Sequence, residues 1–425
     1  MATADGPDRL SPDDARILAV ESAVITGHTL KLNVLEAGAG PLDVDALRDA
    51  VSTRLAAQPR ATQRVDTTAP EPRWVEATDF DIRDHVRRHG PAANRTELWR
   101  SVSGLMAEHL DRSKPLWTFD LIGPMDDGRE AIAVRIHHAM ADGIAAVHFL
   151  DSVLWDAHAD RPVRRSTHAA APEPRGLTEA WRLPGAVLRE LGHPGAHSPF
   201  DRPITGSREL AFTVAPLAEV KAIGASRPTR ATVNDVLLAI IAGGLRAWLD
   251  GQGQDPRRLR AQVPVSLHHR SETELGNHDS FMNVDLPLGE HDPLARLDRI
   301  RAETSERKKL DDADEIYDLM HALGRVKHVG TSARRLAGSP REFSVSISNV
   351  PGPPAPVSVA GRNVVHLFSS SEPALHHALR ISAISCAGDL GVGLCTDPQA
   401  LPDVAGLADA IERSYVELRT AAGWQ

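Results

Sequence analysis

Cysteine, aromatic residues and long apolar runs are all scarce in this chain of 425 residues. The two cysteines, Cys386 and Cys395, are too few for a disulfide framework, and their number fits a reducing cytoplasm. Aromatic side chains make up only 4% of the residues, so the cores must be packed with leucine, valine, isoleucine and alanine. No run of about 18 apolar residues is present, which argues against a helix that crosses a bilayer.

Excess positive charge is missing as well, because the formal net charge at pH 7 is -9. This balance argues against nucleic acid as the main partner. The first residues include Asp5, Asp8, Asp13 and Asp14 and no apolar segment, so we expect no signal peptide. We therefore expect a cytoplasmic protein whose contact with a membrane, where there is any, is peripheral.

The remaining composition, with 42% hydrophobic and 25% charged residues, is that of an ordinary globular protein. The length exceeds that of a usual single core and predicts two domains. A stretch rich in proline, arginine, histidine and alanine is typical of a linker. The predicted division is an N-terminal half of residues 1–156, a linker of residues 157–206 and a C-terminal half of residues 207–425.

Apolar periodicity predicts helices and strands in both halves, which indicates a mixed α/β (α+β) fold. Helical spacing occurs in residues 43–57, 94–110, 142–155, 232–248 and 404–418, and a helix is predicted to start at Asp292-Pro293. Strand patterns occur in residues 116–122, 131–138, 209–214, 261–267, 342–348, 364–368, 379–385 and 389–396.

The most informative stretch runs from Ala131 to Gly143 and places two adjacent histidines at the end of a predicted strand. Apolar residues at every second position share one face with His138, whereas His137 points to the opposite face. An imidazole held at the end of a buried strand can act as a general base near neutral pH. Asp142 is predicted to cap the following helix, and Gly143 permits a tight turn.

Each of these residues also has a less specific interpretation. His138 can be a general base or a hydrogen-bonded core histidine, and His137 can position the site or act as a second catalytic group. Asp142 can orient His138 as in a catalytic triad, but a helix cap or an ion pair with an arginine is the favoured role.

Histidine pairs at residues 137/138, 268/269 and 376/377 raise the question of a zinc site. His138 and Asp142 are four residues apart, which is ligand spacing on a helix. His138 is predicted to lie on a strand, however, and no cysteine is near. We therefore expect no metal and no bound cofactor.

The His137-His138-x-x-x-Asp142-Gly143 pattern resembles the signature of the chloramphenicol acetyltransferase and condensation-domain superfamily. Further motifs resemble those of the bacterial wax ester synthase / diacylglycerol acyltransferase family. They occur in the same order and are Leu10–Asp14, Pro115-Leu116-Trp117, Asn234-Asp235, Val263–Ser266, Leu275–Asn277, Leu286-Pro287 and Ser348–Pro353. The resemblance extends over roughly residues 10 to 420.

This resemblance implies two chloramphenicol acetyltransferase-like halves with a tunnel between them, which acyl-CoA enters from one side and an acceptor alcohol from the other. It implies an acyl-CoA-dependent O-acyltransferase with His138 as general base and His137, Asp142 and Gly143 in support. Acyl-CoA would be a co-substrate, and a long-chain alcohol or diacylglycerol would become a wax ester or triacylglycerol. A membrane or lipid-droplet surface would supply the acceptor.

The other motif residues have structural and functional interpretations side by side. Asn234 and Asp235 fit capping of a buried helix better than substrate contact, and Pro115, Leu116 and Trp117 fit a core strand. Ser348 and Asn349 can donate hydrogen bonds toward an oxyanion.

Two other functions stay open from the sequence. One is an acyltransferase of the same fold in specialised metabolism, with a polar acceptor or a carrier-protein donor. The other is a non-catalytic lipid-binding protein. Basic and apolar residues of the linker, and residues 325–335, are the predicted membrane contacts.

Overall fold

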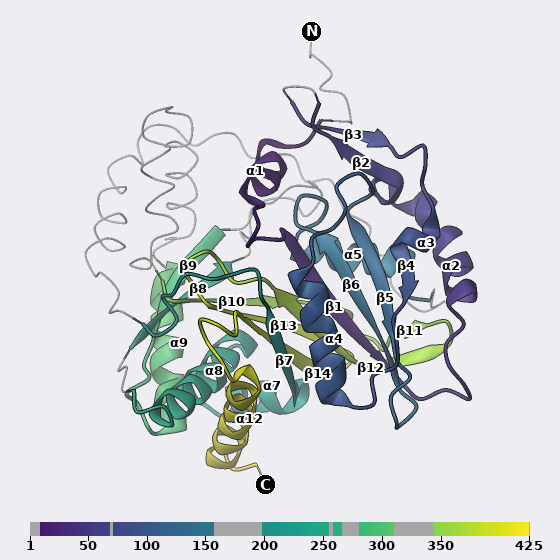
Figure 1. Ribbon diagram of the computed structural model, residues 1–425. Coiled ribbons are helices and arrows are strands. Elements are labelled where there is room, and N and C mark those ends of the chain that lie inside the picture. Colours follow the sequence, from purple (N-terminus) through teal and green to yellow (C-terminus); the bar gives the residue numbers. More distant parts are fainter. Residues whose placement is uncertain are drawn as a thin grey trace.

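The computed structural model describes residues 9–68, 71–156, 198–254, 258–265, 280–309 and 343–424. These residues form two mixed sheets flanked by helices (Figure 1). Most of the predicted linker, the motif residues Ser266 and Leu275–Asn277, the histidine pair at 268/269 and the predicted membrane contact at 325–335 lie outside the described residues.

The first sheet contains six strands of the described chain, in the order β11-β12-β1-β6-β5-β4. Two of them, β5 (Trp117–Ile122) and β6 (Glu130–His137), confirm the strands predicted on either side of the turn at residues 126–128. The others are β1 (His28–Leu35), β4 (Val86–Arg88), β11 (Ser358–Val359) and β12 (Arg362–Ser371). A separate pair, β2 (Gln63–Asp66) and β3 (Arg73–Glu76), lies beside this sheet.

The strands β11 and β12 come from the predicted C-terminal half, yet they extend the sheet of the N-terminal half. β12 pairs with β1 over seven registered positions from Thr29↔Ser371 to Leu35↔Val364. The predicted boundary at residue 207 therefore does not separate the two sheets, although it stays a prediction for the division into domains.

The second sheet has the order β7-β14-β13-β10-β8-β9 among the described residues. Its strands are β7 (Glu209–Pro216), β8 (Leu259–Val265), β9 (Ser280–Leu286), β10 (Val345–Val350), β13 (Leu379–Cys386) and β14 (Asp389–Thr396). All but β9 correspond to predicted strands; β14 has the predicted bounds, and the ends of the others shift by at most three residues.

Two glycines let β14 cross directly against β12. A Cβ atom on Gly391 would lie 2.2 Å from the carbonyl oxygen of Leu367, and one on Gly393 would lie 2.2 Å from that of Ser369. Since these glycines alternate along β14, they share one face. The two sheets therefore meet by backbone contact along this crossing, which fixes where the strand ends of one sheet lie relative to the other.

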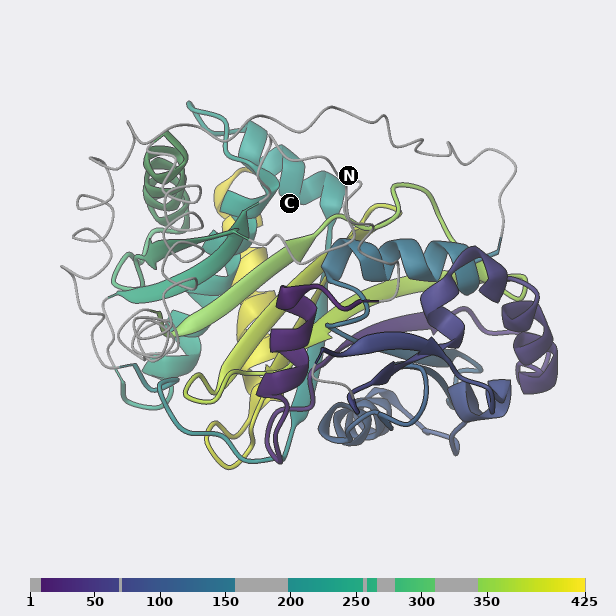
Figure 2. The same cartoon turned by 90° about the horizontal axis from the view of Figure 1, so that it is seen from above.

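Helices cover both sheets, and α4 and α5 lie on opposite faces of the first one (Figure 2). Their bounds are α1 (Pro12–Val20), α2 (Val44–Ser52), α3 (Ile82–His85), α4 (Arg95–Ala107), α5 (Gly143–Val153), α7 (Leu217–Ala225), α8 (Val233–Asp250), α9 (Pro293–Lys309) and α12 (Val404–Ala421). The helix predicted over residues 43–57 ends at Ser52, and its last part is a 3-10 turn at Leu55–Ala57.

The helix α8 is buried almost all round, as its sequence predicts, and it packs against α12. Gly243 and Gly244 allow this close contact. A Cβ on Gly243 would lie 2.2 Å from Ser414 Oγ, and one on Gly244 would lie 2.5 Å from Ile411 Cγ1. The largest hydrophobic core of the described residues forms around this helix pair and the second sheet.

Candidate active site

The two histidines at the end of β6, His137 and His138, lie in different surroundings. The even-numbered residues Val134 and Ile136 of β6 pack under α5. The odd-numbered residues Ala131 and Ala133 pack on the side of α4. His137 is the last residue of the strand, so the predicted strand 131–138 is one residue too long, and His138 follows it directly. The expectation that the two imidazoles start from opposite faces stays a prediction.

His137 is fully buried and is held in one tautomer by the backbone. Its Nδ1 accepts the N–H of Ala139 at 3.1 Å, so the ring proton lies on Nε2. That Nε2 lies against Gly27, where a Cβ atom would be 2.3 Å away, and 3.8 Å from Glu21 Oε2. Burial, followed by the influence of the neighbouring His138 and of Arg112, lowers the pKa of His137 to about 3. The ring is therefore neutral and packs against Gly27.

His138 is fixed through its backbone, because its N–H donates to the carbonyl oxygen of Gly27 at 2.9 Å. Burial, followed by the charges of Arg380 and Lys31, lowers the pKa of His138 to about 3. The sequence argument sought a pKa near the working pH. The difference arises mainly from burial of the ring, and two cations that are absent from the motif, Arg380 and Lys31, add to it.

Asp142 caps α5, as predicted: its Oδ1 accepts the N–H of Ala145 at 2.8 Å. Among the described residues its carboxylate accepts no other hydrogen bond and makes no ion pair with an arginine. The triad-like alternative therefore has no hydrogen bond to support it. The cap explains instead why an aspartate follows the histidines at this spacing, since it starts the helix at the strand end.

Gly143 has a packing role that the sequence did not reveal. A Cβ atom there would lie 2.9 Å from Val350 Cγ2, so only glycine admits this approach without a shift. Val350 is the last residue of β10, which also carries Ser348 and Asn349. The fold therefore brings the Ser348–Pro353 motif of the second sheet to the start of α5.

Ser348 is buried, and its hydroxyl donates to Ser382 Oγ at 3.2 Å, while Asn349 is half-buried. The predicted role of both side chains toward an oxyanion stays a prediction. It is compatible with their position at the end of β10, near Gly143.

Pro115, Leu116 and Trp117 are all buried, which confirms the core interpretation of that motif. Trp117 donates from Nε1 to the carbonyl oxygen of Ala61 at 2.9 Å and stacks on His85 with ring centroids 4.5 Å apart. The carbonyl oxygen of Leu116 accepts the N–H of His137 at 3.0 Å. The motif thus holds the end of β6 through the hydrogen bond between Leu116 and His137.

Asp235 forms the predicted capping box of α8 with Thr232. Its second carboxylate oxygen accepts the hydroxyl of Thr304 at 2.6 Å, which ties α8 to α9. Asn234, beside it, is half-buried and has no hydrogen-bond partner among the described residues. The capping role of Asp235 is confirmed, and substrate contact by Asn234 stays a prediction.

Glu372 holds the turn on which both histidines rest, and sequence reasoning missed it. Its carboxylate accepts the backbone N–H groups of Thr26 at 2.8 Å and Gly27 at 2.7 Å. Gly27 in turn contacts the ring of His137 and accepts the N–H of His138. No local signal links residues 345 positions apart along the chain.

Lys31 was missed for a different reason. It is 2% exposed on β1, between β6 and β12, and donates from Nζ to Ser369 Oγ at 2.8 Å. Burial lowers the pKa of Lys31 to about 8 against the opposing charge of Asp142. The alternation of Leu30, Leu32 and Val34 signals a strand, but it assigns the lysine to a solvent face.

No group of three or more histidine, cysteine, aspartate or glutamate side chains fit to hold a metal ion occurs in the part of the chain that the structure describes. Both cysteines are buried. No described helix is long and apolar enough to cross a membrane.

Family models for the wax ester synthase/diacylglycerol acyltransferase catalytic domain and for the WS/DGAT C-terminal domain match residues 10–191 and 275–419. A probable diacylglycerol O-acyltransferase of Mycobacterium tuberculosis is 30% identical over 97% of this chain and 96% of its own length. The chain belongs to this family. It is an acyltransferase, with the family membership that its motifs predicted.

Solved structures agree with the fold. The wax ester synthase/diacylglycerol acyltransferase from Marinobacter aquaeolei VT8 is 24% identical, with a TM-score of 0.74 over 98% of this chain and 99% of that one. The first condensation domain of the CDA synthetase gives a TM-score of 0.59 at 15% identity, over 98% and 96%. The predicted chloramphenicol acetyltransferase-like architecture is thereby confirmed.

Proposed function

We propose that this acyltransferase moves an acyl group from acyl-CoA to the hydroxyl of a long-chain alcohol or diacylglycerol, with His138 as general base. The observation that carries the proposal is the placement of a neutral imidazole, fixed by Gly27, where the end of β6, the start of α5 and the end of β10 meet. The relatives named as diacylglycerol O-acyltransferases support the acceptor class.

In the proposed reaction, the imidazole of His138 takes the proton of the acceptor hydroxyl as its oxygen attacks the thioester carbonyl. The tetrahedral intermediate then collapses, the carbon–sulfur bond breaks, and the imidazolium returns the proton to the leaving thiolate. The products are an ester and free CoA, and no acyl-enzyme is required.

A pKa of about 3 keeps His138 neutral in the resting enzyme, so it is ready to accept a proton at any physiological pH. The same low value disfavours the imidazolium while the site is empty. The negative oxygen of the tetrahedral intermediate forms together with the imidazolium and would supply its counter-charge. Proton transfer and attack on the thioester are therefore expected to be coupled.

The acceptors of this reaction have to be collected from a lipid surface. A long-chain alcohol has a negligible free concentration in water, since each CH₂ group disfavours water by about 0.8 kcal/mol. Peripheral attachment to a membrane or droplet is therefore part of the proposal. The net charge of -9 speaks for a local patch rather than general attraction to anionic lipid.

A test follows thiol release from palmitoyl-CoA by the full chain, with hexadecanol, with dipalmitoylglycerol, with a water-soluble alcohol and without acceptor. The proposal predicts release that depends on a lipid acceptor, together with the matching ester product. Acceptor-independent binding of lipid without release would instead identify a lipid-binding protein. Efficient acylation of the water-soluble alcohol alone would identify the alternative with a polar acceptor.

A further inference from the structure

The lysine on β1 is a buried cation without an ion-pair partner. Lys31 is 2% exposed, and no carboxylate oxygen of the described residues lies within 4.0 Å of its Nζ. Its single hydrogen bond goes to Ser369 Oγ at 2.8 Å. An ammonium has three N–H donors, so two are unused. Lysine is seldom buried without pairing, because desolvation of the charge is costly.

The ammonium belongs to the same side of the sheet as the general base. Lys31 is the register partner of Val134 on β6, which packs under α5 together with Ile136. His138 continues that face, and its imidazole is exposed to the charge of Lys31. The unused donors therefore lie in the electrostatic surroundings of the group that activates the acceptor hydroxyl.

The nearby protein charges do not neutralise this ammonium. Asp142 acts on Lys31 at a distance, but its carboxylate is engaged in capping α5 through Ala145. Arg380 adds a second positive charge that acts on His138. The two unused N–H donors of Lys31 therefore favour a ligand that brings oxygen atoms or negative charge.

We propose that Lys31 is a specificity-determining residue for the acceptor, binding through its two unused N–H donors an oxygen that the acceptor carries close to its reacting hydroxyl. Ester carbonyl oxygens lie in this position in diacylglycerol, whereas a plain long-chain alcohol has none. A plain alcohol leaves the buried donors unsatisfied, which is how polar sites reject analogues that lack a hydrogen-bonding group. The inference rests on the proposed transfer to alcohols and names which of them this chain prefers.

The test compares kcat/KM for dipalmitoylglycerol and for hexadecanol, with palmitoyl-CoA as donor and both acceptors in the same mixed micelles. The variant is Lys31→Met, which keeps the length and removes the donors. The matched control is Lys221→Met, an exposed lysine on α7. The ratio of the two kcat/KM values should fall roughly 10- to 100-fold in Lys31→Met, through loss of the diacylglycerol reaction, and stay unchanged in the control.

A ratio within about twofold of the wild type would overturn the assignment. An equal loss with both acceptors would also overturn it, because Lys31 would then act on the thioester or on His138. Wild-type enzyme that acylates neither acceptor would refute the proposed function instead. The two failures are therefore distinguishable.

Thermal unfolding separates specificity from structure. Replacing an unpaired buried charge by an apolar side chain of similar size is often neutral or stabilising, so Lys31→Met should unfold at the wild-type temperature or higher. A lower temperature with an unchanged ratio would make Lys31 a structural residue. If the methionine variant does not fold, Lys31→Gln, which removes the charge and keeps a donor for Ser369, provides the same ratio measurement.

Discussion

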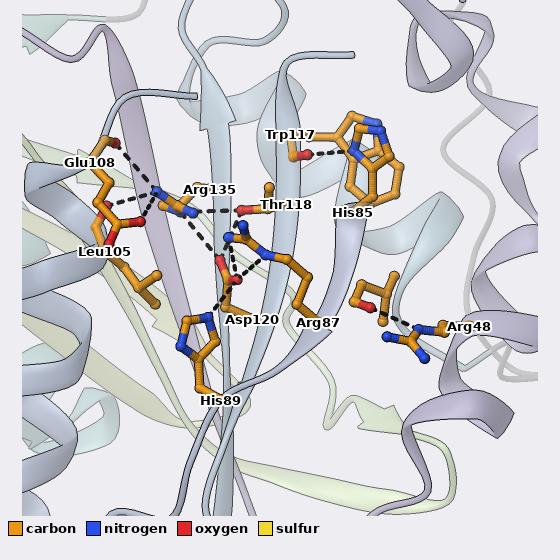
Figure 3. A network of polar contacts seen from close by, with 11 residues as sticks. Arg48, His85, Arg87, His89, Leu105, Glu108, Trp117, Thr118, Asp120 and Arg135 are labelled. Atoms are coloured by element: carbon orange, nitrogen blue, oxygen red, sulfur yellow. Dashed lines mark hydrogen bonds and ion pairs between the residues drawn. The ribbon is translucent and has the colours of Figure 1, made fainter. Parts of the chain in front are cut away.

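Two buried cations on opposite faces of the first sheet, Arg135 and Lys31, have different surroundings. On the α4 side, Arg135 contacts Asp120 at 3.3 Å and donates to the carbonyl oxygen of Leu105 at 2.9 Å, while Arg87 and His89 reach the same carboxylate at 2.8 and 3.0 Å (Figure 3). On the α5 side, Lys31 has no carboxylate partner among the described residues. Glu130, also on the α5 side, is buried and paired with Arg88 and Arg362, so the contrast lies between Arg135 and Lys31 and not between the whole faces.

This division follows from the two-residue period of a strand. Neighbouring side chains such as His137 and His138 enter different environments although they are adjacent in sequence. The Asp120 network joins β4, β5 and β6, and so helps to fix where the histidines at the end of β6 lie. The comparison can be tested by removing charge from each face in turn.

The largest stability effect is expected for Asp120→Ala. The substitution leaves Arg135 and Arg87 without their carboxylate in a buried site, and breaking a buried ion pair costs about 3–5 kcal/mol. Urea unfolding measures the loss. Asp127→Ala, which removes an exposed partner of Arg129, is the control and should change little. A loss for Asp120→Ala no greater than that of the control would mean that the Asp120 network does not stabilise the fold.

Acid should destabilise the folded chain through His137 and His138. The pKa of His137 and that of His138 are lowered to about 3, whereas an unfolded histidine titrates near its ordinary value of about 6.5. The unfolded state then binds more protons between these values, so stability is full above about pH 6.5 and falls as the pH drops toward about 3, by about 1.4 kcal/mol per unit for each such histidine. Urea unfolding at about pH 7 and about pH 5.5 measures this. Constant stability over that range would contradict the lowered pKa values of the two imidazoles.

A smaller effect is expected for Asp142→Ala. Loss of the cap should lower the free energy of unfolding by about 1 kcal/mol and reduce activity by displacing the strand end. Asp43→Ala is the matched control, because it removes the cap of α2 at a comparable cost to stability and away from the histidines. Equal activity losses in the two variants would show that the position of the cap does not matter.

The smallest expected effect is that of metal removal. Since His138 is proposed to act without a Lewis acid, dialysis against a strong chelator should leave the acyl-transfer rate unchanged. Loss of activity that zinc restores would replace the proposed mechanism.

Local features were predictable from the sequence because their causes are local. The cap by Asp142, the capping box of Asp235 and the alternation along β6 each depend on residues a few positions apart. The order of the motifs also identified the family and with it the fold. Trp117 was correctly assigned to the core because an apolar strand surrounds it.

Long-range features were not predictable in the same way. β12 joins the first sheet across more than 300 residues, and Glu372 reaches Gly27 over a comparable separation. No strand was predicted over β1, which is a central strand covered on both sides, so Lys31 is buried. The low pKa of His138 depends on burial of its own ring and on Arg380, and the motif alone reveals neither.

The most direct test of the account is to measure two quantities, the acyl-transfer rate and the unfolding temperature, in His138→Ala and His137→Ala side by side. The account predicts that His138→Ala lowers the rate by roughly 10²- to 10⁴-fold, the scale of a lost general base, and keeps a near-wild-type unfolding temperature. His137→Ala should lower the unfolding temperature, because its buried ring packs against Gly27. It should lower the acyl-transfer rate less than His138→Ala does. A folded His138→Ala variant that turns over at the wild-type rate would contradict the central claim.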